Sequence, residues 1–73
     1  MTASRPIKRS LTIAGHRTSI SLEAAFWDAL QALAQAEGRT MAEIVRAIDE
    51  KRGKAGLSSA IRVHLLERLR RTA

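Results

Sequence analysis

Basic side chains without acidic neighbours dominate the first 22 residues of this chain. Arg5, Lys8, Arg9 and Arg17 fall in this stretch, which contains no Asp or Glu. Clustered Lys and Arg side chains bind phosphate groups by displacing condensed counterions. We therefore expect this segment to contact a polyanion, with Lys8 and Arg9 on its phosphates.

Residue types that could support catalysis or metal binding lack the necessary spacing. His16 and His64 stand far apart in the sequence without a neighbouring pair of carboxylates, which makes a poor metal site. None of the serines has the base and orienting group that a nucleophile needs. The chain contains no Cys and so forms no disulfide or thiolate site. We predict neither an enzyme nor a metal or cofactor site.

Composition points to a small basic domain. The 73 residues include 13 Lys or Arg and 7 Asp or Glu, for a net charge of +6 and a pI near 11.4. The middle of the chain, residues 23–50, is acidic, whereas both ends are basic. No apolar run approaches the roughly 18 residues of a membrane span. We expect a cytoplasmic protein that binds a polyanion and not a membrane.

Residues 7–22 alternate between apolar and polar side chains in two phases, after an arm at residues 1–6 that we predict to be flexible. Odd positions are apolar up to Ile13, even positions are β-branched or apolar from Thr18 to Leu22, and the phase changes near Gly15. Alternation predicts a half-exposed strand, and a phase change at Gly marks a bulge or tight turn. Either two strands form a local hairpin, or one strand follows a partly ordered arm.

The first of three predicted helices covers residues 22–37. Its apolar residues recur at steps of three and four, which places them along one face. Ser21 is the predicted N-cap, and Gly38 supplies the left-handed stop. Trp27 is expected to pack in the core or in an interface.

Two more helices follow the same periodicity. The second covers residues 40–52, and Thr40 with Glu43 forms a capping-box pattern at its start. The third covers residues 58–71, begins at a serine cap and ends in arginines, which the helix dipole favours. We treat residues 7–73 as one domain.

A lone strand exposes backbone N–H and C=O groups that need partners. Two copies related by a two-fold axis could pair their strands as an antiparallel ribbon over a shared helical core. Arg17, Ser19 and Ser21 would then point outward, and such a ribbon fits the major groove of DNA. Because a chain of this size builds only a small core, we expect an obligate homodimer.

The order of these segments resembles the ribbon-helix-helix superfamily of DNA-binding proteins. Its members commonly have a strand, a helix, a Gly-x-Ser/Thr turn and a second helix with an aliphatic-aliphatic-Arg run. The corresponding segments here are ISLE at 20–23, LQALA at 30–34 and GRTMAEIVR at 38–46. The resemblance extends over residues 8–71 and is similar to that of short bacterial members. Glu23 departs from the family, where Pro is frequent.

The resemblance implies roles for individual positions. The three outward strand residues that read DNA bases would be Arg17, Ser19 and Ser21. If residues 7–13 form the ribbon instead, the readers would be Lys8, Ser10 and Thr12. The start of the second helix would hold a phosphate through Arg39, Thr40 and Met41. The dimer core would comprise Ile20, Leu22, Phe26, Leu30, Leu33, Ile44, Val45 and Ile48.

These roles predict a mostly helical ribbon-helix-helix fold, formed as an intertwined homodimer with an additional C-terminal helix. The implied function is sequence-specific binding of double-stranded DNA by a transcriptional repressor on the bacterial nucleoid. An alternative is an antitoxin or partner-binding module that grips another protein through residues 57–73. The apolar face of the third helix motivates this alternative, although that face could equally pack on the same dimer.

Overall fold

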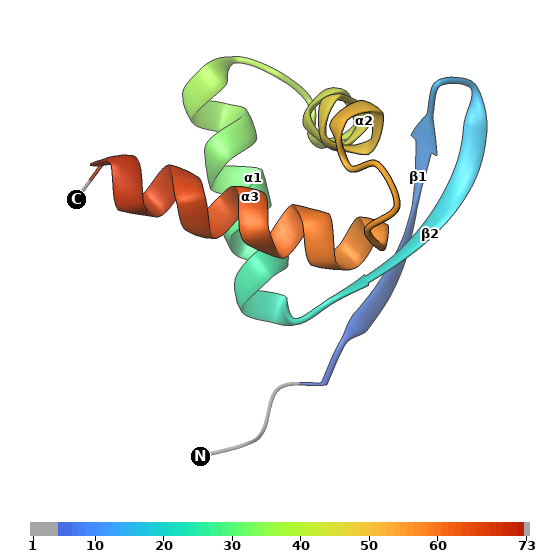
Figure 1. Cartoon of the computed structure of the whole chain (residues 1–73), viewed down its shortest axis with the longest axis horizontal. Helices are drawn as coiled ribbons and strands as arrows, with labels where there is room; N and C mark the ends of the chain where they lie inside the picture. Colours follow the sequence, from blue (N-terminus) through green and yellow to red (C-terminus); the bar gives the residue numbers. More distant parts are fainter. Residues whose placement is uncertain (1–4, 73) are drawn as a thin grey trace.

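A two-stranded antiparallel hairpin precedes three helices, which gather on one side of it (Figure 1). The computed structural model describes residues 5–72, so most of the predicted arm at residues 1–6 lies outside the described residues. The elements are β1 (Ile7–Ile13), β2 (His16–Leu22), α1 (Ala24–Glu37), α2 (Met41–Lys51) and α3 (Leu57–Thr72). This order confirms the predicted strand region followed by three helices.

The hairpin turns through two residues with left-handed backbones. Ala14 and Gly15 have φ values of 51° and 83°, which is the pattern of the type I′ turn that suits the twist of paired strands. A two-residue turn explains the change of phase, because it moves the inward positions from odd numbers in β1 to even numbers in β2. The local hairpin is therefore the correct one of the two interpretations of residues 7–22.

Pairing within one chain differs from the ribbon shared by two copies that the sequence led us to expect. β1 satisfies one edge of β2 in a register running from Ile7 opposite Leu22 to Ile13 opposite His16. The turn bonds Ile13 to His16, and bonded and non-bonded pairs alternate from there. Ser19 therefore directs its backbone N–H and C=O away from β1, toward the open edge.

Helix α1 begins two residues later than predicted. β2 continues through Leu22, so Ser21 is a strand residue, and Glu23 occupies the N-cap position without a side-chain cap. The prediction of Ser21 as N-cap is thus wrong. The C-terminal stop is confirmed: Gly38 has a φ of 63°, and the N–H groups of Gly38 and Arg39 bond to carbonyls of the last turn.

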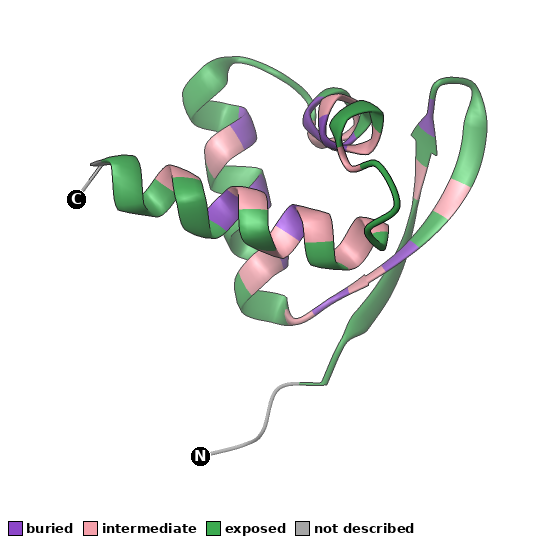
Figure 2. Cartoon of the chain, viewed as in Figure 1, coloured by how far each residue is buried: buried purple, intermediate pink, exposed green. Residues whose placement is uncertain are grey.

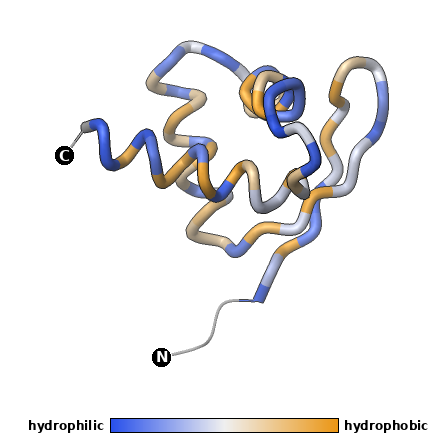
Figure 3. The backbone as a smooth tube through the Cα atoms, viewed as in Figure 1, coloured by the Kyte–Doolittle hydropathy of each residue, from blue (hydrophilic) through white to orange (hydrophobic). Residues whose placement is uncertain are grey.

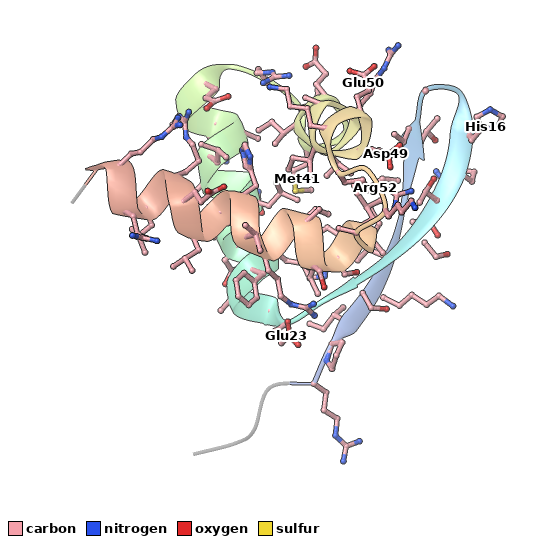
Figure 4. The ribbon with its side chains drawn as sticks, viewed as in Figure 1. His16, Glu23, Met41, Asp49, Glu50 and Arg52 are labelled. Atoms are coloured by element: carbon pink, nitrogen blue, oxygen red, sulfur yellow. The ribbon has the colours of Figure 1, made fainter. Side chains whose placement is uncertain are left out.

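Helix α2 has the predicted capping box. The Thr40 hydroxyl accepts the Glu43 N–H at 3.0 Å, and the Glu43 carboxylate accepts the Thr40 N–H at 2.8 Å. These two bonds satisfy donors that a helix start otherwise leaves without partners. Near the other end, Asp49 and Arg52 form an ion pair (Figure 4).

Helix α3 packs across α1 and closes the core. The Ala60 N–H bonds to the Gly56 carbonyl at 2.9 Å, so the helix begins at Leu57, and Ser58 lies inside its first turn. The prediction of a serine cap here is wrong. Ile61 is fully buried and Leu65 nearly so, whereas the outer side of the helix stays exposed (Figure 2).

The core is complete within a single chain. Six of the eight residues predicted for a dimer core are buried in it, namely Ile20, Leu22, Leu30, Ile44, Val45 and Ile48. The other two, Phe26 and Leu33, are half-buried against that core. Trp27 is 2% exposed, which confirms its predicted packing role. Closure depends on α3, which covers apolar side chains that the sequence left for a partner.

Candidate nucleic-acid interface

Three cross-strand pairs form one polar face of the hairpin. They are Lys8 with Ser21, Ser10 with Ser19, and Thr12 with Arg17. Residues directly opposite each other share a face of the sheet, and five of these six are exposed while Ser21 is half-buried. We call these six residues the outer face. It unites the two sets of base readers that the sequence left as alternatives.

The opposite face of the hairpin rests on the helices. Ile13, Ile20 and Leu22 on this face are buried, and Leu11 and Thr18 are half-buried. Burial of this face leaves the hairpin one orientation, because a slip of register by one residue would exchange the two faces. The helical body thus directs the outer face toward solvent.

The outer face carries two cations and four hydroxyl groups. Lys8 and Arg17 supply the charge, and neither strand contains an Asp or Glu. One Arg17 guanidinium nitrogen donates to the Thr12 hydroxyl at 3.3 Å, which steadies the guanidinium on the exposed surface. A guanidinium can donate two hydrogen bonds to a guanine edge, and hydroxyls can donate to or accept from any base. The arrangement is therefore suited to a polyanion with polar edges.

Arg9 lies on the other face of the hairpin, opposite Ile20 in the register. Its guanidinium stacks 5.2 Å from the centre of the Trp27 ring, and it remains exposed. The Trp27 Nε1–H donates to the Ile7 carbonyl at 2.8 Å. Trp27 thus fixes β1 to α1 and positions Arg9 at the same time. The sequence gave no signal for this link beyond the apolar spacing of Trp27 itself.

The start of α2 brings together the three residues predicted to hold a phosphate. Two of their backbone N–H groups have internal partners: Arg39 donates to the Ala34 carbonyl at 2.9 Å, and Thr40 donates to Glu43. Met41 is half-buried, and its side chain packs against the core. Of the three predicted residues, Met41 is therefore the one whose N–H has no partner within residues 5–72.

Charges around the start of α2 are partly compensated. The Arg39 guanidinium contacts the Glu37 carboxylate at 3.4 Å and the Glu43 carbonyl at 3.3 Å. Hydrogen bonds from the backbone and side chain of Thr40 lower the pKa of Glu43, so its carboxylate is ionised at neutral pH. An anion approaching this helix start would meet a negative charge as well as N–H donors.

A second ion pair joins the start of α1 to α3. Arg62 Nε and Nη2 donate to the two Glu23 carboxylate oxygens at 2.9 and 3.2 Å, where β2 meets α1 (Figure 4). The Arg62 hydrogen bond is the main cause of the lowered pKa of Glu23. Sequence analysis missed this pair, because 39 residues separate its members.

No metal or membrane site is found within the described part of the chain. Residues 5–72 contain no group of three His, Cys, Asp or Glu residues able to hold an ion. His16 lies at the tip of the hairpin, and His64 lies half-buried on α3 (Figure 4). None of the described helices combines the length and apolar character needed to cross a bilayer.

The domain family that matches this chain agrees with the hairpin and helices. The profile of the ribbon-helix-helix domain aligns with residues 6–69, which is most of the chain. The chain belongs to the ribbon-helix-helix family. Proteins of this family are typically DNA-binding transcriptional regulators or antitoxins, they generally form dimers, and the fold is not typically enzymatic. Comparisons with curated proteins and with solved structures give no significant match.

Family membership confirms the resemblance that the sequence indicated. This ribbon-helix-helix domain has an antiparallel ribbon, two helices joined by a Gly-x-Thr turn, and a third helix. Its ribbon is formed by two strands of the same chain. The outer face is consequently complete on one chain, with each of its six positions present once.

Proposed function

We propose that this protein binds double-stranded DNA sequence-specifically through the outer face of its hairpin and acts as a transcriptional repressor. The observation that carries the proposal is the outer face itself, with six polar side chains, two cations and no carboxylate. A two-stranded ribbon fits the major groove, where each base pair presents a distinct set of donors and acceptors. The basic composition of the chain and its family support the same function.

In this proposal each part of the outer face has a separate task. Arg17 donates to a guanine edge, and Ser19 and Ser21 contact neighbouring bases. Ser10 and Thr12, on the adjacent strand, extend the contact, and Lys8 binds a phosphate. Arg9 and the start of α2, through Arg39, Thr40 and Met41, are further phosphate contacts in the proposal, with Met41 supplying a backbone N–H.

Repression follows from occupation of the site. A protein bound in the major groove of an operator excludes polymerase or another regulator from the same DNA. Its place of action would be nucleoid DNA in a bacterial cytoplasm. Binding should weaken steeply with salt: if a dimer neutralises about six phosphates, log Kobs against log[salt] should have a slope of roughly −5.

The decisive experiment combines site selection with one substitution. A preferred duplex is first selected from a random-sequence library, and fluorescence anisotropy then compares it with a scrambled duplex. Arg17→Ala should weaken binding to the preferred duplex by about 1–3 kcal/mol and reduce the preference over the scrambled one. Arg71→Ala is the matched control, because it removes the same charge from the far end of α3 (Figure 1).

Two results would contradict the proposal. One is the failure of the library to yield any duplex that binds better than random DNA. The other is a salt-independent affinity. If Arg17→Ala instead lowers affinity equally for both duplexes, Arg17 is a phosphate contact and the base-reading role passes to the serines and Thr12.

A partner-binding or antitoxin role remains the second candidate function. Val63, Leu66 and Leu69 on α3 are each more than half exposed, which favours a protein surface within residues 57–73. Deleting this segment would not test the role, because Ile61 and Leu65 belong to the core. Stoichiometric co-purification of a different protein, lost on Leu66→Glu, would support it.

A further inference from the structure

An apolar groove lies in the angle between α1 and α3. It encloses about 350 Å³ and is lined by Ala25, Phe26 and Ala29 of α1 and by Val63, Leu66 and Leu69 of α3. We call these six residues the α1–α3 groove. Hydrophobic stretches recur along α3 into its exposed half (Figure 3). The three α3 side chains are 54%, 53% and 65% exposed.

Nothing in the fold of one chain requires these side chains to be exposed. β2 already has a partner strand, and the apolar residues of the hairpin and of α2 are already buried by α3. The usual grounds for a dimer, an unpaired strand and an open core, are therefore largely met inside the chain. Of the large apolar side chains described as exposed, three of four belong to the groove, and the fourth is Ile7.

The groove is complementary to itself in shape. Its α1 side consists of two alanines beside Phe26, and its α3 side consists of protruding Val and Leu side chains. In a two-fold contact the same patch meets itself, so α3 of each copy lies against α1 of the other. Leu66 and Leu69 would then insert over the small Ala25 and Ala29 of the second copy.

The charges beside the groove are complementary under the same symmetry. Asp28 follows Ala25 by three residues and borders the α1 side, while Arg70 follows Leu66 by four and borders the α3 side. Both are exposed. A two-fold axis that places α1 against α3 brings Asp28 of each copy toward Arg70 of the other. Arg62 adds no unpaired charge, because Glu23 holds it and it stacks 5.7 Å from the Phe26 ring.

We propose that the α1–α3 groove is the homodimer interface of this protein, occupied by the same groove of a second copy. The family generally forms dimers, and this proposal locates the contact away from the ribbon. The open edge of β2 stays free in such a dimer, and each copy keeps its own outer face. The inference does not depend on DNA binding and is tested without DNA.

Sedimentation equilibrium of the full chain over about 1–200 μM measures the dimer directly. Leu66→Glu should raise the dimer dissociation constant at least tenfold, because it places a charge in the apolar contact. Gln31→Glu is the matched control: it adds the same charge to an exposed position of α1 outside the groove. Circular dichroism melts show whether each variant is folded, which Leu66 permits because it is exposed in the single chain.

A charge exchange provides a second test. Asp28→Arg and Arg70→Asp should each weaken the dimer severalfold, and the double variant should recover most of the loss. Recovery is expected only if the two side chains meet across the interface. Ser19→Pro tests the alternative contact through the ribbon, since it removes a backbone donor from the open edge of β2 and leaves the pairing with β1 intact.

Three outcomes would overturn the proposal. The first is a wild-type chain that stays monomeric up to 200 μM. The second is a dimer that resists Leu66→Glu but dissociates with Ser19→Pro, which would assign the contact to the strand edge. The third is additive loss in the double charge variant.

Discussion

Trp27→Phe should destabilise the chain by removing the link between β1 and α1. The substitution keeps an aromatic ring in the 2% exposed site but removes the Nε1–H that donates to the Ile7 carbonyl at 2.8 Å. An intramolecular hydrogen bond contributes about 0.5–1.5 kcal/mol net, and the smaller ring leaves a void and a weaker surface for Arg9. We expect a loss of about 2 kcal/mol in the free energy of unfolding.

Urea denaturation followed by far-ultraviolet circular dichroism measures this loss, because the substitution removes the single Trp that would report by fluorescence. A 2 kcal/mol loss corresponds to a decrease in Tm of roughly 8–16 °C for a domain of this size. Trp27→Ala should cost about 3–5 kcal/mol, comparable to all that such a small core supplies, and should leave the chain largely unfolded.

Hydrogen exchange separates this reasoning from a general loss of packing. In Trp27→Phe the amides of the hairpin should lose more protection than those of α2, because the lost bond holds β1. Phe26→Ala, at the half-buried neighbouring position, is the comparison. A loss below about 0.5 kcal/mol in Trp27→Phe, or equal loss of protection in the hairpin and in α2, would refute the assigned role of Trp27.

Two further predictions concern the turn and the ion pair at the start of α1. Ala14→Asn should stabilise the hairpin by up to about 1 kcal/mol, since Asn tolerates the left-handed backbone that Ala14 adopts at φ 51°; an unchanged or lower Tm would count against the type I′ assignment. The pKa of Glu23 is lowered in the folded chain, so the unfolded chain binds more protons as pH falls, and the stabilisation present at neutral pH is lost below the ordinary Glu range. Tm measured between pH 6 and pH 3 should therefore fall less in Glu23→Gln than in the wild type, and parallel curves would show that the pair does not contribute.

Local patterns in the sequence predicted much of the fold. The capping residues Thr40 and Glu43 and the left-handed stop at Gly38 act within a few residues, so their sequence signals are self-contained. Alternation in residues 7–22 likewise predicted which strand side chains point inward, because the pleat fixes this without reference to a partner. The outward positions of Arg17 and Ser19 followed from the same argument and are exposed as predicted.

The partner of each surface could not be predicted in the same way. Alternation shows which face of a strand is buried but not which strand pairs with it, so the hairpin and the ribbon of two chains gave the same pattern. Ser21 and Ser58 are good caps by type, yet the extent of β2 and the early start of α3 place them inside regular elements. The Glu23–Arg62 pair and the α1–α3 groove depend on how α3 crosses α1, which no short segment encodes.

A ribbon contained in one chain also changes how its surface can evolve. In a ribbon built from two identical chains, each substitution is copied by symmetry, so a new contact at one position imposes the same contact at its mate. Here Lys8, Ser10 and Thr12 stand opposite Ser21, Ser19 and Arg17 as six different genetic positions. Each can be altered alone, and the target of one hairpin is free to be asymmetric.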